Sequence, residues 1–310
     1  MKKLIIPLLC IAAIILTVIY KDDLVNLAER VFNDKQYLNI LPGNEYTKND
    51  SYLYVQKTDD FVPLGYQDLL NIYYSIINNH WESFTFYCPK EYSSCTDDIT
   101  KLSESSLTLS NINNFVHPFN SFTHIKTSID SNGEIIVKVS YLYTKEQISY
   151  INSEVDRIIA ENYDNNLPIY DNLKNIHDYI INTTKYDIDY EKNKDIQTFN
   201  AYGVLKEHLA TCNGYSDLMA IILSKLNINN YKIAYNPDDI KEDDGHVWNA
   251  AYVNGQWLHI DLTWDDPVGD GRDYLYHKYF LVNTNEMMEA DAGNVQVVEH
   301  AFDKRVYQEF

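Results

Sequence analysis

The chain has 310 residues, of which 45% are hydrophobic and 14% aromatic. This is enough for one large or two ordinary domains with a real core, and it excludes wholesale disorder. Asp and Glu number 45 against 25 Lys and Arg, which gives a net charge of −20. A surface this acidic repels phosphate backbones, so charge-driven binding of nucleic acid is excluded.

The first twenty residues predict a membrane anchor. Lys2 and Lys3 precede an apolar run over residues 4–20, which as a helix is about 25 Å long and marginally spans a hydrocarbon core. The positive amino end favours a single-pass orientation with the rest of the chain outside the cytoplasm. No small-x-small cleavage site follows, so an uncleaved anchor is favoured over a cleaved signal peptide, which would give a secreted protein. Residues 21–45 are polar and indicate a spacer above the membrane.

The cysteines fit an exported protein. Cys10 lies in the apolar run, and Cys88 and Cys95 flank a short turn, which makes them the natural pair in an oxidising compartment. Cys212 is then left alone. An unpaired thiol outside the cytoplasm is either tolerated in a core or kept for its reactivity.

Residues 46–163 are expected to form an accessory α+β domain without a catalytic constellation. Asn132-Gly133 lies between two alternating segments, which is a strong β-hairpin signal. Ile135, Val137 and Val139 share one face of its second strand. Periodicity predicts a helix over 69–77, a strand over 81–87, hairpin strands over 122–129 and 134–143, and a helix over 148–159.

The second segment, residues 164–310, carries the chemistry. A helical stripe covers residues 173–181, and Cys212 begins an apolar helix that runs to Leu226. A helix N-terminus stabilises negative charge and favours a thiolate, as a nucleophile needs. The alternative is a small buried thiol that packs against the helix start, and position alone does not separate the two.

A second hairpin is predicted around Asn254-Gly255, with strands over 246–253 and 256–264. With a two-residue loop, Val253 faces Gln256, His246 faces Thr263 and Trp248 faces Asp261. His246 and Asp261 are then diagonal neighbours on one face, about 7–8 Å apart at the backbone. Asp261 can therefore accept from one imidazole nitrogen and leave the other to face a thiol.

Other candidate sites in this segment are weaker. His259 falls on the same face of the hairpin as His246, and we expect it to be a packing histidine. The acidic loop over residues 237–244 could hold Ca²⁺, but a solvated acidic face is the expected role. Neither an H-E-x-x-H pair, a C-x-x-C pair nor a glycine-rich nucleotide loop occurs, so no metal or cofactor is expected.

Several short segments, in this order, resemble the transglutaminase-like superfamily, in particular its exported bacterial members. Many members have Gly-Val where this chain has Ala210-Thr211. The resemblance covers residues 165–285 and is carried by Ile176-His177-Asp178-Tyr179-Ile180, Tyr186-Asp187, Tyr202-Gly203-Val204-Leu205, Cys212-Asn213-Gly214-Tyr215, His246-Val247-Trp248-Asn249, the run from Trp257 to Asp266, and Tyr279-Phe280-Leu281-Val282.

The resemblance implies a fold and a mechanism. The fold is a papain-like α+β core, in which the helix bearing the cysteine packs on an antiparallel sheet. Cys212 would be the nucleophile, His246 the base and Asp261 the group that orients the base. The Cys212 amide would be one oxyanion donor, with the second unassigned.

The expected function is acyl transfer on amide bonds of a protein or peptide, such as one associated with a cell wall, through a thioester. Water as acceptor would make the protein a protease or amidase, and a lysine amine would make it a transglutaminase. The alternative is a non-catalytic cell-surface binding module that keeps the fold.

Overall fold

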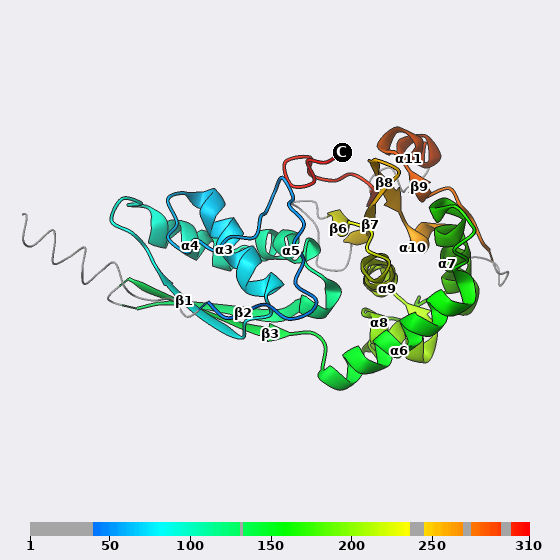
Figure 1. Ribbon diagram of the computed structural model, residues 1–310, viewed down its shortest axis with the longest axis horizontal. Helices are drawn as coiled ribbons and strands as arrows, with labels where there is room; N and C mark the ends of the chain where they lie inside the picture. The colour runs from blue at the N-terminus through cyan, green and yellow to red at the C-terminus, as the bar shows by residue number, and fades with distance from the viewer. Residues whose placement is uncertain (1–39, 131–132, 236–244, 269–273, 293–298) are drawn as a thin grey trace, which may run out of the picture. The chain divides into compact units, whose positions relative to one another are not determined.

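The computed structural model describes residues 40–130, 133–235, 245–268, 274–292 and 299–310 (Figure 1). The predicted membrane helix over 1–20, most of the spacer over 21–45 and the acidic loop over 237–244 lie outside the described residues. Within the described part, no helix has both the length and the apolarity to cross a membrane. The described residues from Leu41 onward form one compact unit. The division at residues 163 and 164 stays a prediction.

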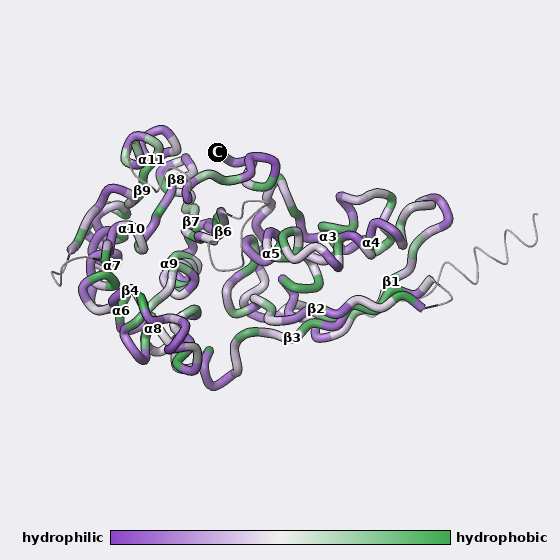
Figure 2. Tube along the Cα trace, turned by 180° about the vertical axis from the view of Figure 1, so that it is seen from behind, coloured by the Kyte–Doolittle hydropathy of each residue, from purple (hydrophilic) through white to green (hydrophobic). Residues whose placement is uncertain are grey.

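The first part of this unit is a three-stranded antiparallel sheet with helices. The predicted hairpin is confirmed, with Ile129 opposite Ile135. Ile135, Val137 and Val139 are buried, and hydrophobic and hydrophilic stretches alternate along the second strand of the hairpin in Figure 2. The strand order is β1-β3-β2, and the elements are α3 (Tyr66–Asn78), β1 (Ser83–Tyr87), α4 (Cys95–Glu104), α5 (Ser106–Asn114), β2 (Phe122–Ile129) and β3 (Glu134–Tyr141).

Two helices in this part, α4 and α5, were not expected from the sequence. They are short and rich in Ser, Thr, Asn and Asp, so that α4 buries only Cys95, Ile99 and Leu102. Residues of these types hydrogen-bond locally and favour turns, which hides the apolar period. A disulfide joins Cys88 to Cys95 at the start of α4, with Cα atoms 5.8 Å apart, and the expected pairing is confirmed.

The second part carries a four-stranded antiparallel sheet in the order β6-β7-β8-β9. A short parallel pair, β4-β5, lies beside it in the chain, so the fold is a mixture of helices and mainly antiparallel sheets, as expected. Its elements are α6 (Lys145–Asn162), α7 (Ile169–Thr183), β4 (Lys185–Tyr186), α8 (Ala201–Glu207), β5 (Leu209–Ala210), α9 (Cys212–Lys225), β6 (Asn230–Tyr235), β7 (His246–Val253), β8 (Gln256–Ile260), α10 (Leu262–Asp265), β9 (Phe280–Val282) and α11 (Thr284–Asp291).

Helix α9 is the centre of this second part. It lies between the sheet and the helices α6 and α8, and Gly214 to Leu223 are all buried (Figure 1). A helix that is buried on every side must be apolar on every side, which explains the run Leu218 to Leu223. Gly214 is required because a Cβ there would lie 2.2 Å from the Thr198 carbonyl oxygen.

A buried polar network ties the segment between β3 and α6 to α9. The Tyr143 hydroxyl donates to Asp217 Oδ2 at 2.7 Å and accepts from the Ala201 amide at 2.9 Å. Lys232 Nζ donates to Asp217 Oδ1 at 2.6 Å, and all of these side chains are buried. Burial and the Asp217 charge hold the pKa of Tyr143 well above its usual range, so the hydroxyl stays protonated.

We expect Tyr143→Phe to lower the free energy of unfolding by about 1.5–3 kcal/mol, because it removes a hydrogen bond to a buried carboxylate. Urea denaturation measures this loss. Tyr252→Phe is the matched control, since the Tyr252 ring is exposed on β7, and its effect should stay within about 0.5 kcal/mol. Equal losses in the two variants would contradict the role given to Tyr143.

Candidate active site

Cys212 is the first residue of α9, as the sequence predicts. Thr211 precedes it as the N-cap, and its amide donates to the Thr198 carbonyl at 2.9 Å, which holds the approach to the helix. The Cys212 side chain is partly exposed and is the free cysteine of the described residues. The first amides of a helix have no partner within it, so this position favours an anion.

The β7–β8 ladder follows the predicted register from Val253 opposite Gln256 to Asn249 opposite Ile260. The predicted continuation of the strand to Trp264 is wrong. The second strand ends at Ile260, and residues 262–265 form α10. The predicted facing of His246 with Thr263 and of Trp248 with Asp261 therefore does not occur. On its other edge, β7 pairs with β6, where His246 lies opposite Tyr235.

Asp261 explains why the strand ends at Ile260 and a helix begins after it. It is the N-cap of α10, and its Oδ1 accepts from the Thr263 amide at 2.8 Å and the Trp264 amide at 3.2 Å. An Asp at an N-cap supplies partners for amides that otherwise have none, so the chain gains more by turning into a helix than by continuing the strand.

The structure brings the three predicted residues together. His246 Nε2 donates to Asp261 Oδ2 at 2.5 Å, and both side chains are buried. His246 also forms a hydrogen bond with Cys212. Because Nε2 is bonded to Asp261, this bond is made by the other ring nitrogen, Nδ1. Cys212 of α9, His246 of β7 and Asp261 at the N-cap of α10 thus form a chain from thiol to imidazole to carboxylate.

Two further contacts lock α9 against the sheet. The Tyr215 hydroxyl donates to Asp266 Oδ2 at 2.6 Å, next to α10. Asn249 Nδ2 donates to the Ser216 carbonyl at 2.9 Å. Both bonds are buried, and they fix the start of α9 relative to His246 and Asp261.

His246 is held as a cation. Burial lowers its pKa, but the Asp261 charge, the hydrogen bond to Asp261 and the contact with Cys212 outweigh burial and raise the pKa to about 10. Burial raises the pKa of Asp261, but His246 and a second histidine hold it well below its usual range. The pair is therefore an imidazolium and a carboxylate at neutral pH.

That second histidine is His300, which the sequence did not reveal. His300 Nε2 donates to Asp261 Oδ2 at 2.9 Å, and its Nδ1 donates to Asp291 Oδ1 at 2.9 Å. All three side chains are buried. Burial lowers the pKa of His300, and the two carboxylates raise it overall, so it too is a cation. His300 lies 39 residues after Asp261, a separation that corresponds to no helical, strand or motif spacing that a sequence reading could use.

His259 packs, as expected, and is uncharged. It is fully buried, its Nδ1 accepts from Trp248 Nε1 at 3.0 Å, and its Nε2 donates to Thr284 Oγ1 at 3.1 Å. Its ring stacks on Phe310 with centroids 4.0 Å apart. Burial lowers its pKa to about 3.

Comparison with known proteins agrees with this geometry. Residues 156–262, about a third of the chain, match the sequence model of the transglutaminase-like superfamily. This segment is therefore similar to transglutaminase-like domains. It contains Cys212, His246 and Asp261, whereas His300 and Asp291 lie outside it.

The similarity to individual proteins is more distant. Over 116 residues, the chain is 23% identical to kyphoscoliosis peptidase of Mus musculus and 24% identical to that of Homo sapiens. Each alignment covers 34% of this chain and 18% of the relative, so the chain spans less than a fifth of either. A crystal structure described as a TGase aligns with a TM-score of 0.32 and 18% identity, over 46% of this chain and 45% of that one.

We expect ¹⁵N imidazole spectra to show that His246 is charged and His259 is neutral. His246 should stay an imidazolium to about pH 9, and His259 should stay neutral above pH 5, because their pKa values are about 10 and about 3. Asp261→Asn should lower the pKa of His246 to about 6.5 or below, since burial then prevails. A neutral His246 at pH 7 in the unchanged protein would contradict the ion pair.

The same shift sets the direction of a stability effect. The pKa of His246 in the folded protein lies above the unfolded value of about 6.5. The protonated His246 therefore contributes its full stabilisation to the free energy of unfolding below pH 6.5, and this stabilisation is lost as the pH rises towards 10. The difference in unfolding free energy between the protein and its His246→Asn variant should shrink over this range.

We expect His300→Ala to lower the free energy of unfolding by about 3–5 kcal/mol, because Asp291 then keeps a buried charge without its cation. Adding Asp291→Asn removes that charge. The double variant should therefore recover about 0.5–3 kcal/mol relative to the sum of the single losses, measured by urea denaturation at pH 6. Strictly additive losses would show that the two residues do not act as a pair.

Proposed function

We propose that this protein is a cysteine-dependent acyltransferase that acts on amide bonds of a protein or peptide. The observation that carries the proposal is the buried His246, bonded to Asp261 through Nε2 and to Cys212 through its other nitrogen. A nucleophile, a base and a group that orients the base are the parts that such chemistry needs.

The reaction has two steps. The Cys212 thiolate attacks the amide carbonyl carbon, and the C=O electron pair moves to oxygen. His246 then gives its proton to the leaving nitrogen as the C–N bond breaks, which leaves a thioester and an amine or ammonia. Water or a second amine loses a proton to His246, attacks the thioester and releases the thiolate.

The oxyanion formed in each step needs hydrogen-bond donors. The Cys212 amide at the start of α9 is one donor that we assign. Trp264 is the second. Its ring lies edge-on to that of His246, with centroids 6.3 Å apart, and its Nε1 is a buried donor without a partner in the described part of the chain.

Asp261 sets the orientation of the base before a substrate binds. Its two oxygens accept from four donors, two imidazoles and two backbone amides. The carboxylate is therefore fixed, and the imidazole that donates to it keeps its second nitrogen towards Cys212.

The site of action is the extracytoplasmic face of a cell membrane, with the chain anchored through residues 1–20. The disulfide between Cys88 and Cys95 supports this placement, because such bonds persist in oxidising compartments. The partner would be a protein or peptide reached there, such as one associated with a cell wall, and not nucleic acid. Residues 46–163 would serve as the accessory domain.

The test is the rate at which iodoacetamide alkylates Cys212 as a function of pH. A Cys10→Ser background leaves Cys212 as the free thiol, since Cys88 and Cys95 are joined. The rate should level off in mildly acidic buffer, because the adjacent imidazolium stabilises the thiolate. His246→Ala should shift the profile to alkaline pH, and Asp261→Asn should shift it less far.

A rate that rises only near the free-thiol value of about 8.5, unchanged in both variants, would exclude the enzyme and leave a non-catalytic binding module. If the thiolate is found, a glutamine-containing peptide with a fluorescent primary amine separates the two acceptors. Incorporation of the amine indicates a transglutaminase, and release of peptide fragments or ammonia indicates a hydrolase. Cys212→Ser is the control for either outcome.

A further inference from the structure

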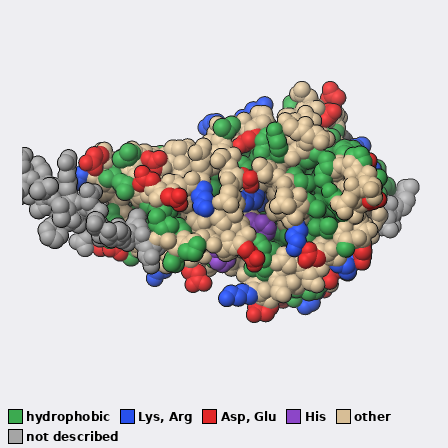
Figure 3. All heavy atoms as spheres, in the orientation of Figure 1, with side chains coloured by type: hydrophobic (Ala, Val, Ile, Leu, Met, Phe, Trp, Pro, Cys, Tyr) green, Lys and Arg blue, Asp and Glu red, His purple; other side chains and the backbone are tan. Residues whose placement is uncertain are grey.

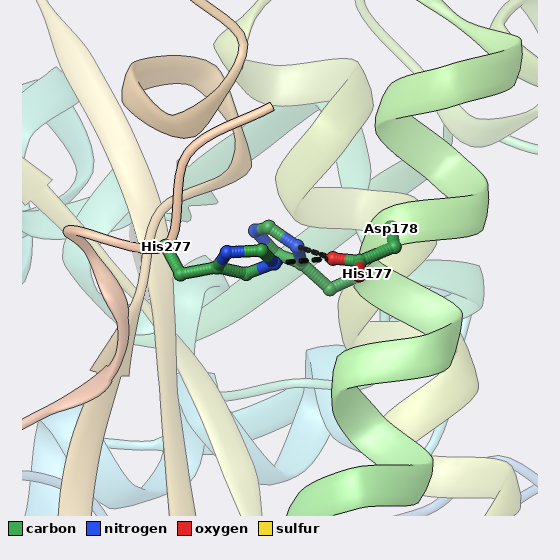
Figure 4. Close-up of side chains that lie close together, drawn as sticks. All are labelled: His177, Asp178 and His277. Atoms are coloured by element: carbon green, nitrogen blue, oxygen red, sulfur yellow. Dashed lines mark hydrogen bonds and ion pairs between the residues drawn. The ribbon is translucent and has the colours of Figure 1, made fainter. Parts of the chain in front are cut away.

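A second cluster of histidine and carboxylate side chains lies outside the thiol site. His177 and Asp178 extend from α7, and His277 extends from the segment that leads into β9, so that both rings point to the Asp178 carboxylate (Figure 4). Asp178 Oδ1 lies 3.0 Å from His177 Nδ1 and 2.6 Å from His277 Nε2. A separation of 100 residues between the histidines hides this cluster in the sequence.

The far side of His177 is held by another carboxylate. His177 Nε2 lies 3.2 Å from Asp265 Oδ2, and both side chains are fully buried. Asp265 Oδ1 also accepts from the amides of Lys278 at 2.8 Å and Tyr279 at 3.2 Å, which fixes it in place. A histidine that donates Nε2–H to a buried carboxylate presents the Nδ1 lone pair on its other side, and this is the usual arrangement of a metal-binding histidine.

The Nδ1 lone pair of His177 would then face an anionic oxygen of Asp178. Two electron-rich atoms 3.0 Å apart require a cation between them. Either a proton or a metal ion meets this need. The presence of His277 on the same oxygen adds a third ligand and favours the metal.

We propose that His177 Nδ1, Asp178 Oδ1 and His277 Nε2 bind a zinc ion or a similar divalent transition metal. Two imidazoles and one carboxylate are a ligand set that zinc accepts, with water in the fourth position. The three ligand atoms lie within 4.8 Å of one another.

The geometry needs only a small adjustment. Tetrahedral zinc with bonds of about 2.0–2.2 Å places its ligand atoms about 3.3–3.6 Å apart. The present contacts of 3.0 and 2.6 Å are shorter than this, so Asp178 and His277 must move outward by less than about 1 Å. Their side chains are 22% and 31% exposed, which leaves room for the movement.

The surroundings allow a cation to enter and one carboxylate oxygen to bind it. Lys174 Nζ holds Asp178 Oδ2 at 2.7 Å, which leaves Oδ1 for the metal. Asp178 also lines a surface cavity of about 580 Å³ between the end of α6 and α7, so the carboxylate is open to solvent. Acidic side chains are scattered among basic ones on the face seen in Figure 3, and the net charge of −20 attracts cations to the protein.

The ion would stabilise the fold near the thiol site without entering the reaction. It would join α7 to the segment before β9. Through Asp265 it would also join both to α10, whose N-cap is Asp261. The expected effect is therefore on unfolding and not on the chemistry at Cys212.

The test uses the full-length protein, stripped with a chelator and then given Zn²⁺ or Co²⁺. We expect one equivalent of zinc to remain after gel filtration, measured by elemental mass spectrometry, and the Tm to rise with zinc. Co²⁺ should give the visible absorption of a low-coordinate site with nitrogen ligands. None of these readouts depends on activity, so they are independent of the proposed function.

Variants decide whether the cluster is the site. His277→Ala should weaken zinc binding by about 100-fold or more, and Asp178→Asn should weaken it similarly, because each removes a ligand. His277 is partly exposed, so its loss should leave the fold intact. His124→Ala, which removes an exposed histidine of β2, is the matched control and should bind zinc normally. Absence of stoichiometric zinc, or equal binding in His277→Ala, would overturn the proposal and leave a proton on His177.

Discussion

The buried carboxylate of Asp261 is the constraint around which the candidate active site is arranged. A carboxylate that loses water costs several kcal/mol unless charges and hydrogen bonds replace its hydration. Asp261 receives all of its replacements from four donors: His246 and His300 on Oδ2, and the Thr263 and Trp264 amides on Oδ1. The need to satisfy this one group ends β8, begins α10 and draws the C-terminal segment onto the sheet.

Charge balance explains the unusual number of buried histidines. Asp261, Asp265 and Asp291 are each buried and each contact an imidazole. His246 and His300 are cations because they lie between acceptors, whereas His259, with Trp248 and Thr284 as neighbours, is neutral. Histidine is therefore charged at one position and neutral at another within one sheet, and the neighbouring groups determine its charge at each position.

Sequence patterns predict the parts of this protein that depend on local rules. Apolar periodicity predicts α3, α6, α7 and α9, and the Asn-Gly pairs predict both hairpins. The register of the second hairpin is predicted correctly from Val253 to Asn249. The start of α9 at Cys212 also follows from spacing along a short segment. The closeness of His246 to Asp261 was predicted as well, but it arises at the N-cap of α10 and not within the β7–β8 ladder. Helices α4 and α5 were not predicted, because their Ser, Thr and Asn residues obscure the period.

By itself, the sequence predicted the mixed α/β character, favoured the pairing of Cys88 with Cys95, and singled out Cys212, His246 and Asp261 as candidates. Only the tertiary structure decided where Asp261 points, since the choice between strand and helix cap depends on buried amides. It also brought in His300, 39 residues from Asp261, and joined His277 to His177. Such contacts close long loops of chain, and their residues carry no periodic signal because packing alone selects them.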